Sequence, residues 1–75
     1  MYLHMLSEGE AGSVKTLEAD EGIRRRLRDL GIIDGTRITC LQKSPLGDPV
    51  AYLIRGAVIA LRKEDAATIL LESEG

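Results

Sequence analysis

Residues 50–61 read VAYLIRGAVIAL, two apolar runs on either side of Arg55-Gly56. Short apolar runs bounded by a turn are typical of β-strands, and a two-residue connection that contains glycine predicts a tight hairpin. The sequence leaves the type of turn open. Both strands are apolar on both faces, so we expect one face to pack on the core and the other to be partly covered.

Further strands are expected on both sides of this hairpin. Residues 36–43 place Ile38 and Cys40 on one side and Arg37 and Thr39 on the other, an alternation that indicates a half-buried strand. The remaining expected elements are a strand at 12–17, a helical turn at 62–67 and a closing strand at 68–72. Five short strands with one longer helix favour a mainly β protein, built as a small and strongly bent barrel.

One amphipathic helix is expected between Asp20 and Leu30. Asp20 is a suitable N-cap, because its carboxylate can accept a hydrogen bond from a free N–H group of the first turn. The apolar stripe of this helix consists of Ile23, Leu27 and Leu30. Gly31 favours the left-handed conformation that ends a helix, and Ile32 can then fold back onto Leu27, as in a Schellman motif.

The composition fits one folded domain over residues 1–75 and argues against an enzyme. Hydrophobic residues make up 44% of the chain and charged residues 29%, with a net charge of −2, a balance that suits a folded chain. With two tyrosines and no Phe or Trp, the core must be mainly aliphatic. The sequence has no nucleophile elbow, phosphate-binding loop or dinucleotide fingerprint, so we expect neither catalysis nor a cofactor.

The single cysteine and the single histidine are expected to be structural. Cys40 shares the inward side of its strand with Ile38, so we interpret it as a small buried hydrophobe and not as a nucleophile. His4 could bind a metal with Glu8 or Glu10, but a surface histidine is the more ordinary interpretation. One cysteine forms no intrachain disulfide, and no apolar run approaches the roughly 20 residues that span a bilayer, so we expect a cytoplasmic protein that is not inserted in a membrane.

Arginines cluster on the predicted helix, at positions 24, 25, 26 and 28. Arg24 and Arg28 share one flank, Arg25 points away from the core, and Arg26 can lay its stem along apolar surface with its head in water. The cluster is either a solvated face or a docking face for an acidic partner, formed by Arg24, Arg25 and Arg28. In the first case the balancing acidic residues are Glu18, Glu21 and Asp29. Nucleic acid is not expected as a partner, because the chain is acidic and lacks aromatic residues to stack on bases.

A second candidate surface is the loop at 44–49, which contains two prolines and a glycine. Prolines stiffen a loop and lower the entropy that it loses on ordering, and Asp48 can cap a turn with its side chain. A stiff loop with an exposed Leu46 is a plausible recognition surface. The alternative is that the residues Leu46, Gly47, Asp48 and Pro49 only shape a corner of the barrel, and the sequence favours neither interpretation.

A series of short motifs runs through the chain in a fixed order. They are Gly12 and Val14, RLRDLGI at 26–32, DGT at 34–36, PLGDP at 45–49, and Gly56 with IALR at 59–62. In this order and spacing they resemble the FeoA family, small cytoplasmic proteins that accompany the FeoB ferrous-iron transporter. The resemblance implies an SH3-like β-barrel of about five strands with one inserted α-helix and a short second helix.

The resemblance also implies a function, that of an accessory protein of ferrous iron uptake which contacts the cytoplasmic part of FeoB. The candidate docking residues are Arg24, Arg25, Arg28, Leu46, Gly47, Asp48 and Pro49. Two other functions stay open: a regulatory module related to the SH3-like domain of iron-dependent repressors, and a protein that stimulates a partner GTPase through a helix arginine. A homodimer is also possible, and the resemblance points to no metal-ligating residue.

Overall fold

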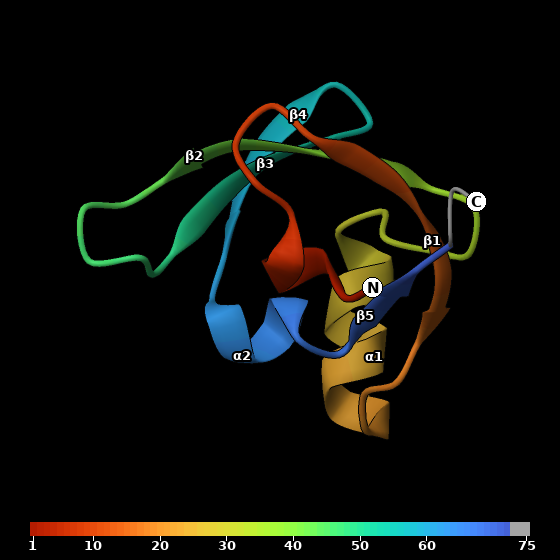
Figure 1. Ribbon diagram of the computed structural model, residues 1–75. Helices are drawn as coiled ribbons and strands as arrows, with labels where there is room; N and C mark the ends of the chain where they lie inside the picture. The colour runs from red at the N-terminus through yellow and green to blue at the C-terminus, as the bar shows by residue number, and fades with distance from the viewer. Residues whose placement is uncertain (73–75) are drawn as a thin grey trace.

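A five-stranded antiparallel sheet arches over two α-helices and a short 3₁₀ helix (Figure 1), in a computed structural model that describes residues 1–72. In chain order the elements are η1 (Leu3–Met5), β1 (Ala11–Leu17), α1 (Glu21–Asp29), β2 (Arg37–Lys43), β3 (Val50–Ile54), β4 (Ala57–Leu61), α2 (Lys63–Ala66) and β5 (Ile69–Leu71). The strand order in the sheet is β4-β3-β2-β1-β5. The expected mainly β architecture is therefore confirmed. Each predicted boundary differs by at most one residue, and η1 was not predicted.

The β3–β4 hairpin closes through a type I′ turn, which the sequence had left undecided. Both central residues have positive φ, with 51° at Arg55 and 82° at Gly56. This turn matches the right-handed twist of the strands that it joins. Register shifts between Val14 and Thr16 in β1 and between Cys40 and Gln42 in β2 add local curvature, so the sheet bends around the core.

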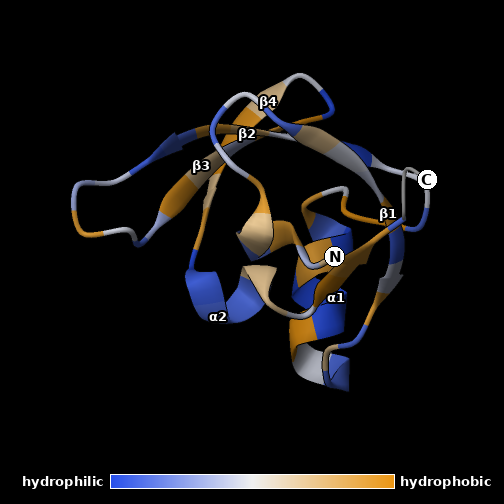
Figure 2. Cartoon of the chain, viewed as in Figure 1, coloured by the Kyte–Doolittle hydropathy of each residue, from blue (hydrophilic) through white to orange (hydrophobic). Residues whose placement is uncertain are grey.

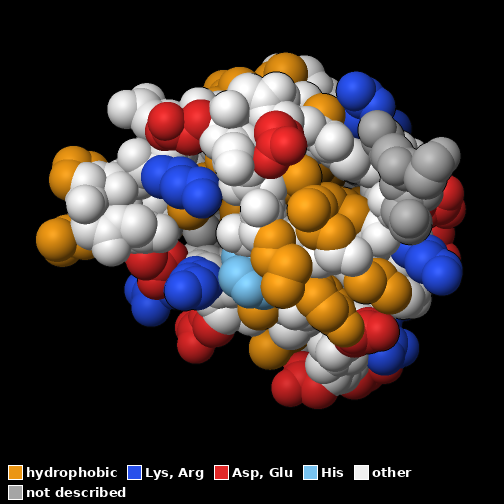
Figure 3. Space-filling view, in the orientation of Figure 1, with side chains coloured by type: hydrophobic (Ala, Val, Ile, Leu, Met, Phe, Trp, Pro, Cys, Tyr) orange, Lys and Arg blue, Asp and Glu red, His pale blue; other side chains and the backbone are white. Residues whose placement is uncertain are grey.

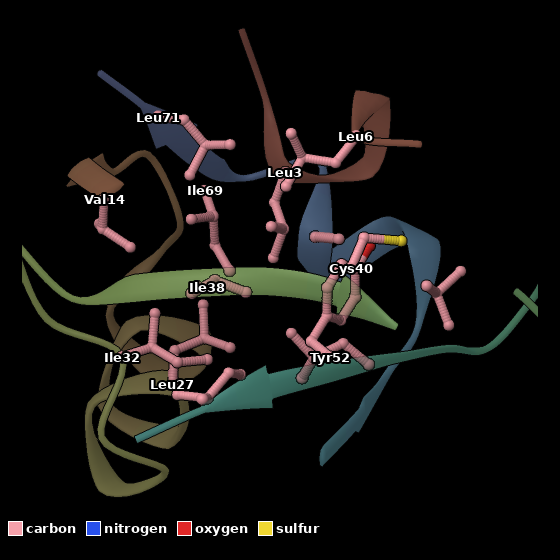
Figure 4. Close-up of a cluster of buried hydrophobic side chains, with 14 of the residues drawn as sticks. Leu3, Leu6, Val14, Leu27, Ile32, Ile38, Cys40, Tyr52, Ile69 and Leu71 are labelled. Atoms are coloured by element: carbon pink, nitrogen blue, oxygen red, sulfur yellow. The ribbon is translucent and has the colours of Figure 1, made fainter. Parts of the chain in front are cut away.

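The core lies on the concave side of the sheet and is mainly aliphatic. Figure 4 shows side chains from η1, α1, β2 and β5 that meet in one cluster. Its fully buried members include Leu3, Val14, Leu27, Ile32, Ile38, Cys40, Ile54 and Ile69. Tyr52 contributes the aromatic ring of this cluster and is 1% exposed. Cys40 is buried as expected, and burial raises the pKa of its thiol, with acidic Glu8 and Glu10 acting in the same direction against Lys43.

The ends of α1 are formed as the sequence predicted. The Ile23 amide donates to Asp20 Oδ1 at 3.0 Å, so Asp20 is the N-cap. At the other end Gly31 has a φ of 91°, and the Ile32 amide donates to the Leu27 carbonyl at 3.0 Å. These features complete a Schellman motif.

The predicted apolar stripe of α1 is wrong at Leu30, which is 39% exposed. Leu27 is fully buried, whereas Ile23 is only partly buried against the core. Leu30 is the C-cap residue. The chain reverses immediately after it, and the fully buried Ile32 fills the core instead.

The buried Tyr52 hydroxyl predicts a loss of stability at alkaline pH. Burial is the main cause that raises its pKa to about 12, and Cys40 and Asp48 add to it. Since the unfolded chain ionises near pH 10, only the folded chain keeps the proton between about pH 10 and 12. The free energy of unfolding should therefore fall as the pH rises through this window, by roughly 2 to 3 kcal/mol from this group. Urea denaturation of wild type and Tyr52→Phe at neutral and alkaline pH measures the difference.

Tyr2→Phe is measured beside Tyr52→Phe, because Tyr2 is the other tyrosine of the chain and its pKa is raised as well. Tyr2 donates from its hydroxyl to Glu18 on the surface, and this hydrogen bond is the main cause that raises its pKa. If Tyr52→Phe loses stability above pH 10 as steeply as wild type does, the buried hydroxyl is not the cause of the loss.

Candidate docking surfaces

Arg24 is held by the fold and is not a free docking residue. Its Nη2 donates to the Ala19 carbonyl at 3.0 Å, and its Nη1 lies 3.8 Å from Glu21 Oε2. Its side chain is 36% exposed. The guanidinium therefore fixes the chain that enters α1 and is only partly available to a partner.

Arg26 forms an ion pair that was not predicted from the sequence. Its Nη2 lies 3.2 Å from Oδ2 and 3.3 Å from Oδ1 of Asp65 in α2. The Asp65 side chain is only 13% exposed, while that of Arg26 is 62% exposed. The pair joins α1 to α2 across 39 positions of sequence. No local pattern indicates a contact of that separation.

Arg25 and Arg28 are the exposed remainder of the arginine cluster. Within residues 1–72, neither guanidinium takes part in a hydrogen bond to a side chain or in an ion pair with a carboxylate. An exposed arginine without an intramolecular partner can pair with an acidic group of another molecule at a small desolvation cost. These two residues are therefore the part of the predicted basic surface that the structure leaves available.

The loop between β2 and β3 projects from the sheet on the side away from α1 (Figure 1). Leu46 at its tip is 94% exposed, and Figure 3 shows hydrophobic side chains at the end of this projection. Gly47 has a φ of 84°, a conformation that glycine adopts without strain. Asp48 is not free, because its Oδ1 accepts from the Lys63 amide at 2.8 Å. Asp48 anchors the loop to the start of α2, and Leu46 is the residue that the loop presents.

The two predicted surfaces do not form one site. Figure 1 shows the β2–β3 loop and α1 on opposite sides of the molecule. A compact partner would use one of them, or one of them with the surface that lies between.

The outward face of β2, β3 and β4 is an apolar surface that was expected to be partly covered, and Figure 2 shows β3 and β4 as mainly hydrophobic strands. We call it the outer face. Its large side chains are Leu41, Leu53 and Val58, which are 39%, 38% and 67% exposed. The strand register places Leu53 opposite Val58 and Ala51 opposite Ala60. Leu41 and Leu53 are thus partly shielded, as expected, whereas Val58 is largely exposed.

The charged residues within β2, β3 and β4 and directly at their ends are arginine or lysine, while the carboxylates of Glu8 and Asp48 accept from the Lys43 and Lys63 amides nearby. Neither β2 nor residues 50–63 contain an Asp or Glu. Arg37, Lys43, Arg55 and Arg62 lie at the ends of these strands. An apolar centre with a basic rim complements an apolar segment that carries acidic residues.

The geometry offers no clustered metal ligands in the part of the chain that is described. Across residues 1–72, no three His, Cys, Asp or Glu side chains lie close enough together to hold a metal ion. His4 lies in η1 and stacks loosely on Tyr2, with 6.4 Å between the ring centroids. In the same range, no helix is long and apolar enough to span a membrane.

Comparison with known proteins identifies the family. A model of the FeoA domain matches residues 1–73. The chain belongs to the FeoA family. A relative from Porphyromonas gingivalis, described as a fusion of Fe(2+) transport protein A and the Fe(2+) transporter FeoB, is 38% identical over 72 residues. The match covers 96% of this chain and 8% of the fusion protein, so the chain corresponds to a small part of that relative.

Solved FeoA structures share the fold over nearly the full chain. The FeoA protein of Chlorobium tepidum superposes with a TM-score of 0.90 at 32% identity, covering 100% of this chain and 71% of that one. FeoA of Stenotrophomonas maltophilia, solved with zinc and described as an SH3 domain protein, has a TM-score of 0.84 at 28% identity, covering 96% and 89%. The expected SH3-like fold is thereby confirmed.

A manganese-dependent transcriptional repressor also contains a similar fold. It superposes with a TM-score of 0.86 at 23% identity, covering 97% of this chain and 41% of the repressor. At this identity the likeness concerns the fold alone.

Proposed function

We propose that this FeoA-family chain is a cytoplasmic accessory protein of ferrous iron uptake, which docks on the cytoplasmic part of a FeoB-type transporter and modulates transport. The observation that supports this most is the fusion relative, in which a region 38% identical to this chain is joined covalently to a FeoB transporter. Covalent linkage gives two modules a high effective concentration for each other. A separate chain with the same task needs a docking surface instead.

Three features of the surface are available for docking. They are the exposed arginines Arg25 and Arg28, the tip of the β2–β3 loop at Leu46, and the outer face. Arg24 and Asp48 support these surfaces from within the fold. Gly47 and Pro49 shape the loop that presents Leu46. In this proposal the chain acts by binding, and its residues carry out no chemical step.

Two narrower functions stay predictions. Stimulation of a partner GTPase would require a helix arginine to reach a bound nucleotide, and Arg25 and Arg28 are exposed in the way that such a role needs. Regulation of a metal-dependent repressor is favoured by no observation beyond the shared fold. GTP turnover by the transporter, measured with and without the purified chain, would distinguish GTPase stimulation from simple docking.

The proposal predicts a loss of ferrous iron uptake in cells that lack the gene. Uptake of labelled ferrous iron should fall several-fold in the deletion strain and return when the wild-type chain is supplied from a plasmid. Uptake of another metal through an unrelated transporter serves as the control. Equal ferrous uptake with and without the gene would overturn the proposal.

A further inference from the structure

The sheet has one open edge among the residues that the structure describes, and β4 forms it. At the opposite end of the sheet, the N-terminal segment covers β5, because Tyr2 bridges to Leu70 and the Leu71 amide donates to the Met1 carbonyl at 2.8 Å. β4 pairs with β3 on one side and with no strand on the other. In an antiparallel pair only every second residue bonds to the neighbouring strand. Counted from the turn, the backbone groups of Val58 and Ala60 point to the open side.

This edge lacks the usual protection of exposed strands. Natural edge strands are commonly interrupted by lysine, proline or a β-bulge, which prevents pairing with another chain. β4 reads AVIAL, without charge or proline. Its register with β3 runs through five consecutive pairs without a shift. Val58 is 67% exposed, so the edge offers free backbone groups next to apolar side chains.

A groove runs along the second half of this edge. Its volume is about 500 Å³, and it lies between α1, α2 and β4. Arg26 and Leu30 form the α1 wall, and Ala60 and Leu61 form the β4 wall. Leu30, whose exposure was unexpected, is thus the apolar residue that faces β4 across the groove. An added strand would lie about 4.8 Å from β4, with Leu30 on its other side.

The charges at the two ends of β4 decide what can occupy the edge. Arg55 precedes the strand, and Arg62 and Lys63 follow it. Glu64 and Asp65 come next and also line the groove, but Asp65 is paired with Arg26. Basic side chains therefore outnumber acidic ones around the strand. If two copies paired along the whole of β4, Ile59 would face Ile59 of the second copy, and Arg55 of each chain would meet Lys63 of the other. This arrangement places like charges together at both ends. An apolar segment with carboxylates at its ends has the opposite and favourable pairing.

We propose that the β4 edge binds an extended segment of its partner protein as a sixth strand, and that this segment is apolar in its centre and acidic at both ends. Main-chain hydrogen bonds to Val58 and Ala60 would hold the segment, while Leu30 and Val58 contact its side chains. The identity of the partner rests on the proposed function, since we take it to be the cytoplasmic part of the transporter. The chemistry of the edge does not depend on that identity.

Amide hydrogen exchange measured by NMR tests the proposal residue by residue. The first probe is the purified cytoplasmic part of the transporter, and the second is a synthetic peptide with alternating Val and Thr in its centre and two Glu at each end. Either probe should slow exchange at Val58 and Ala60. The amides of Ala57 and Ile59, which already face β3, should change little. A peptide with Lys at both ends should bind about tenfold more weakly.

Two variants and one control locate the binding. Val58→Pro removes one outward N–H and leaves the ladder to β3 in place, and Ala60→Lys puts a protecting lysine on the edge. Both should weaken binding of either probe at least about tenfold. Ser7→Lys places the same charge at an exposed residue just before β1, outside every candidate docking surface, and should bind as wild type does. If Val58→Pro fails to fold, Ala60→Lys decides.

The outcomes separate this proposal from the proposed function. If the transporter part binds but amide exchange at Val58 and Ala60 is not slowed, strand addition is overturned and the proposed function is kept. If the transporter part does not bind but the acidic peptide slows exchange at these amides, the proposed function is overturned and strand addition at the β4 edge is kept. No slowing with the peptide would overturn strand addition. Slowed exchange that grows with the concentration of the chain alone would also overturn it, because a second copy would be the occupant.

Discussion

Replacing Leu27 by alanine is expected to lower the free energy of unfolding by about 3 to 4 kcal/mol. Leu27 is the one fully buried side chain of α1, and it packs in the core with Ile32 and Ile38. Domains have about 0.05 to 0.15 kcal/mol of stability per residue, which for a chain of this length is roughly 4 to 11 kcal/mol. The variant should therefore lose about a quarter or more of its stability. Urea denaturation followed by circular dichroism measures it.

Leu30→Ala is the matched control for Leu27→Ala. It removes the same atoms from the same helix, three positions further on, at a residue that is 39% exposed. Its effect should stay below about 1 kcal/mol. If the two variants lose the same amount of stability, the Leu27 side of α1 does not face the core. The same conclusion follows if Leu27→Ala loses less than about 1 kcal/mol.

Reversing the charge of both exposed arginines should slow association with the transporter. In Arg25→Glu/Arg28→Glu the rate constant for binding to the transporter's cytoplasmic part is expected to fall about 10- to 100-fold at low salt. The cause is the loss of electrostatic steering toward an acidic partner. The difference from wild type should shrink as salt is added, because ions screen exposed charges. Stopped-flow mixing over a series of salt concentrations measures both effects.

The control for this variant is Met5→Glu/Ser7→Glu/Lys15→Glu. It changes the net charge by the same amount, at exposed positions in η1, just before β1 and on β1. If steering depends on the α1 surface, this control should associate much faster than the arginine variant. Equal rates would show that only the net charge of the chain matters, and the assignment of Arg25 and Arg28 as docking residues would be wrong.

Local sequence patterns predicted most of the helix ends, strands and turns, because contacts within a few residues determine these features. Asp20 caps α1, and Gly31 ends it in the left-handed conformation, each through contacts within a few residues. The β3–β4 hairpin likewise follows from two apolar runs and Arg55-Gly56. Its turn type needed the structure, since both I′ and II′ turns accept a glycine.

The candidate site was less predictable, because its contacts join distant parts of the chain. The sequence did not reveal that Arg26, which is still 62% exposed, pairs with Asp65, or that Asp48 accepts from the Lys63 amide. Helical periodicity places Arg24 on a surface flank without revealing the Ala19 carbonyl that it binds. Alternation along β4 could not show that this strand lies at the edge of the sheet, since strand order is a property of the whole fold.

Titration of the purified chain with the cytoplasmic part of the FeoB-type transporter encoded in the same genome tests the central claim most directly. Calorimetry should show saturable binding with one chain for each transporter domain. If both proteins are folded and the measured heats equal those of dilution at every salt concentration, the result contradicts the claim that this FeoA-family chain works by docking on the transporter.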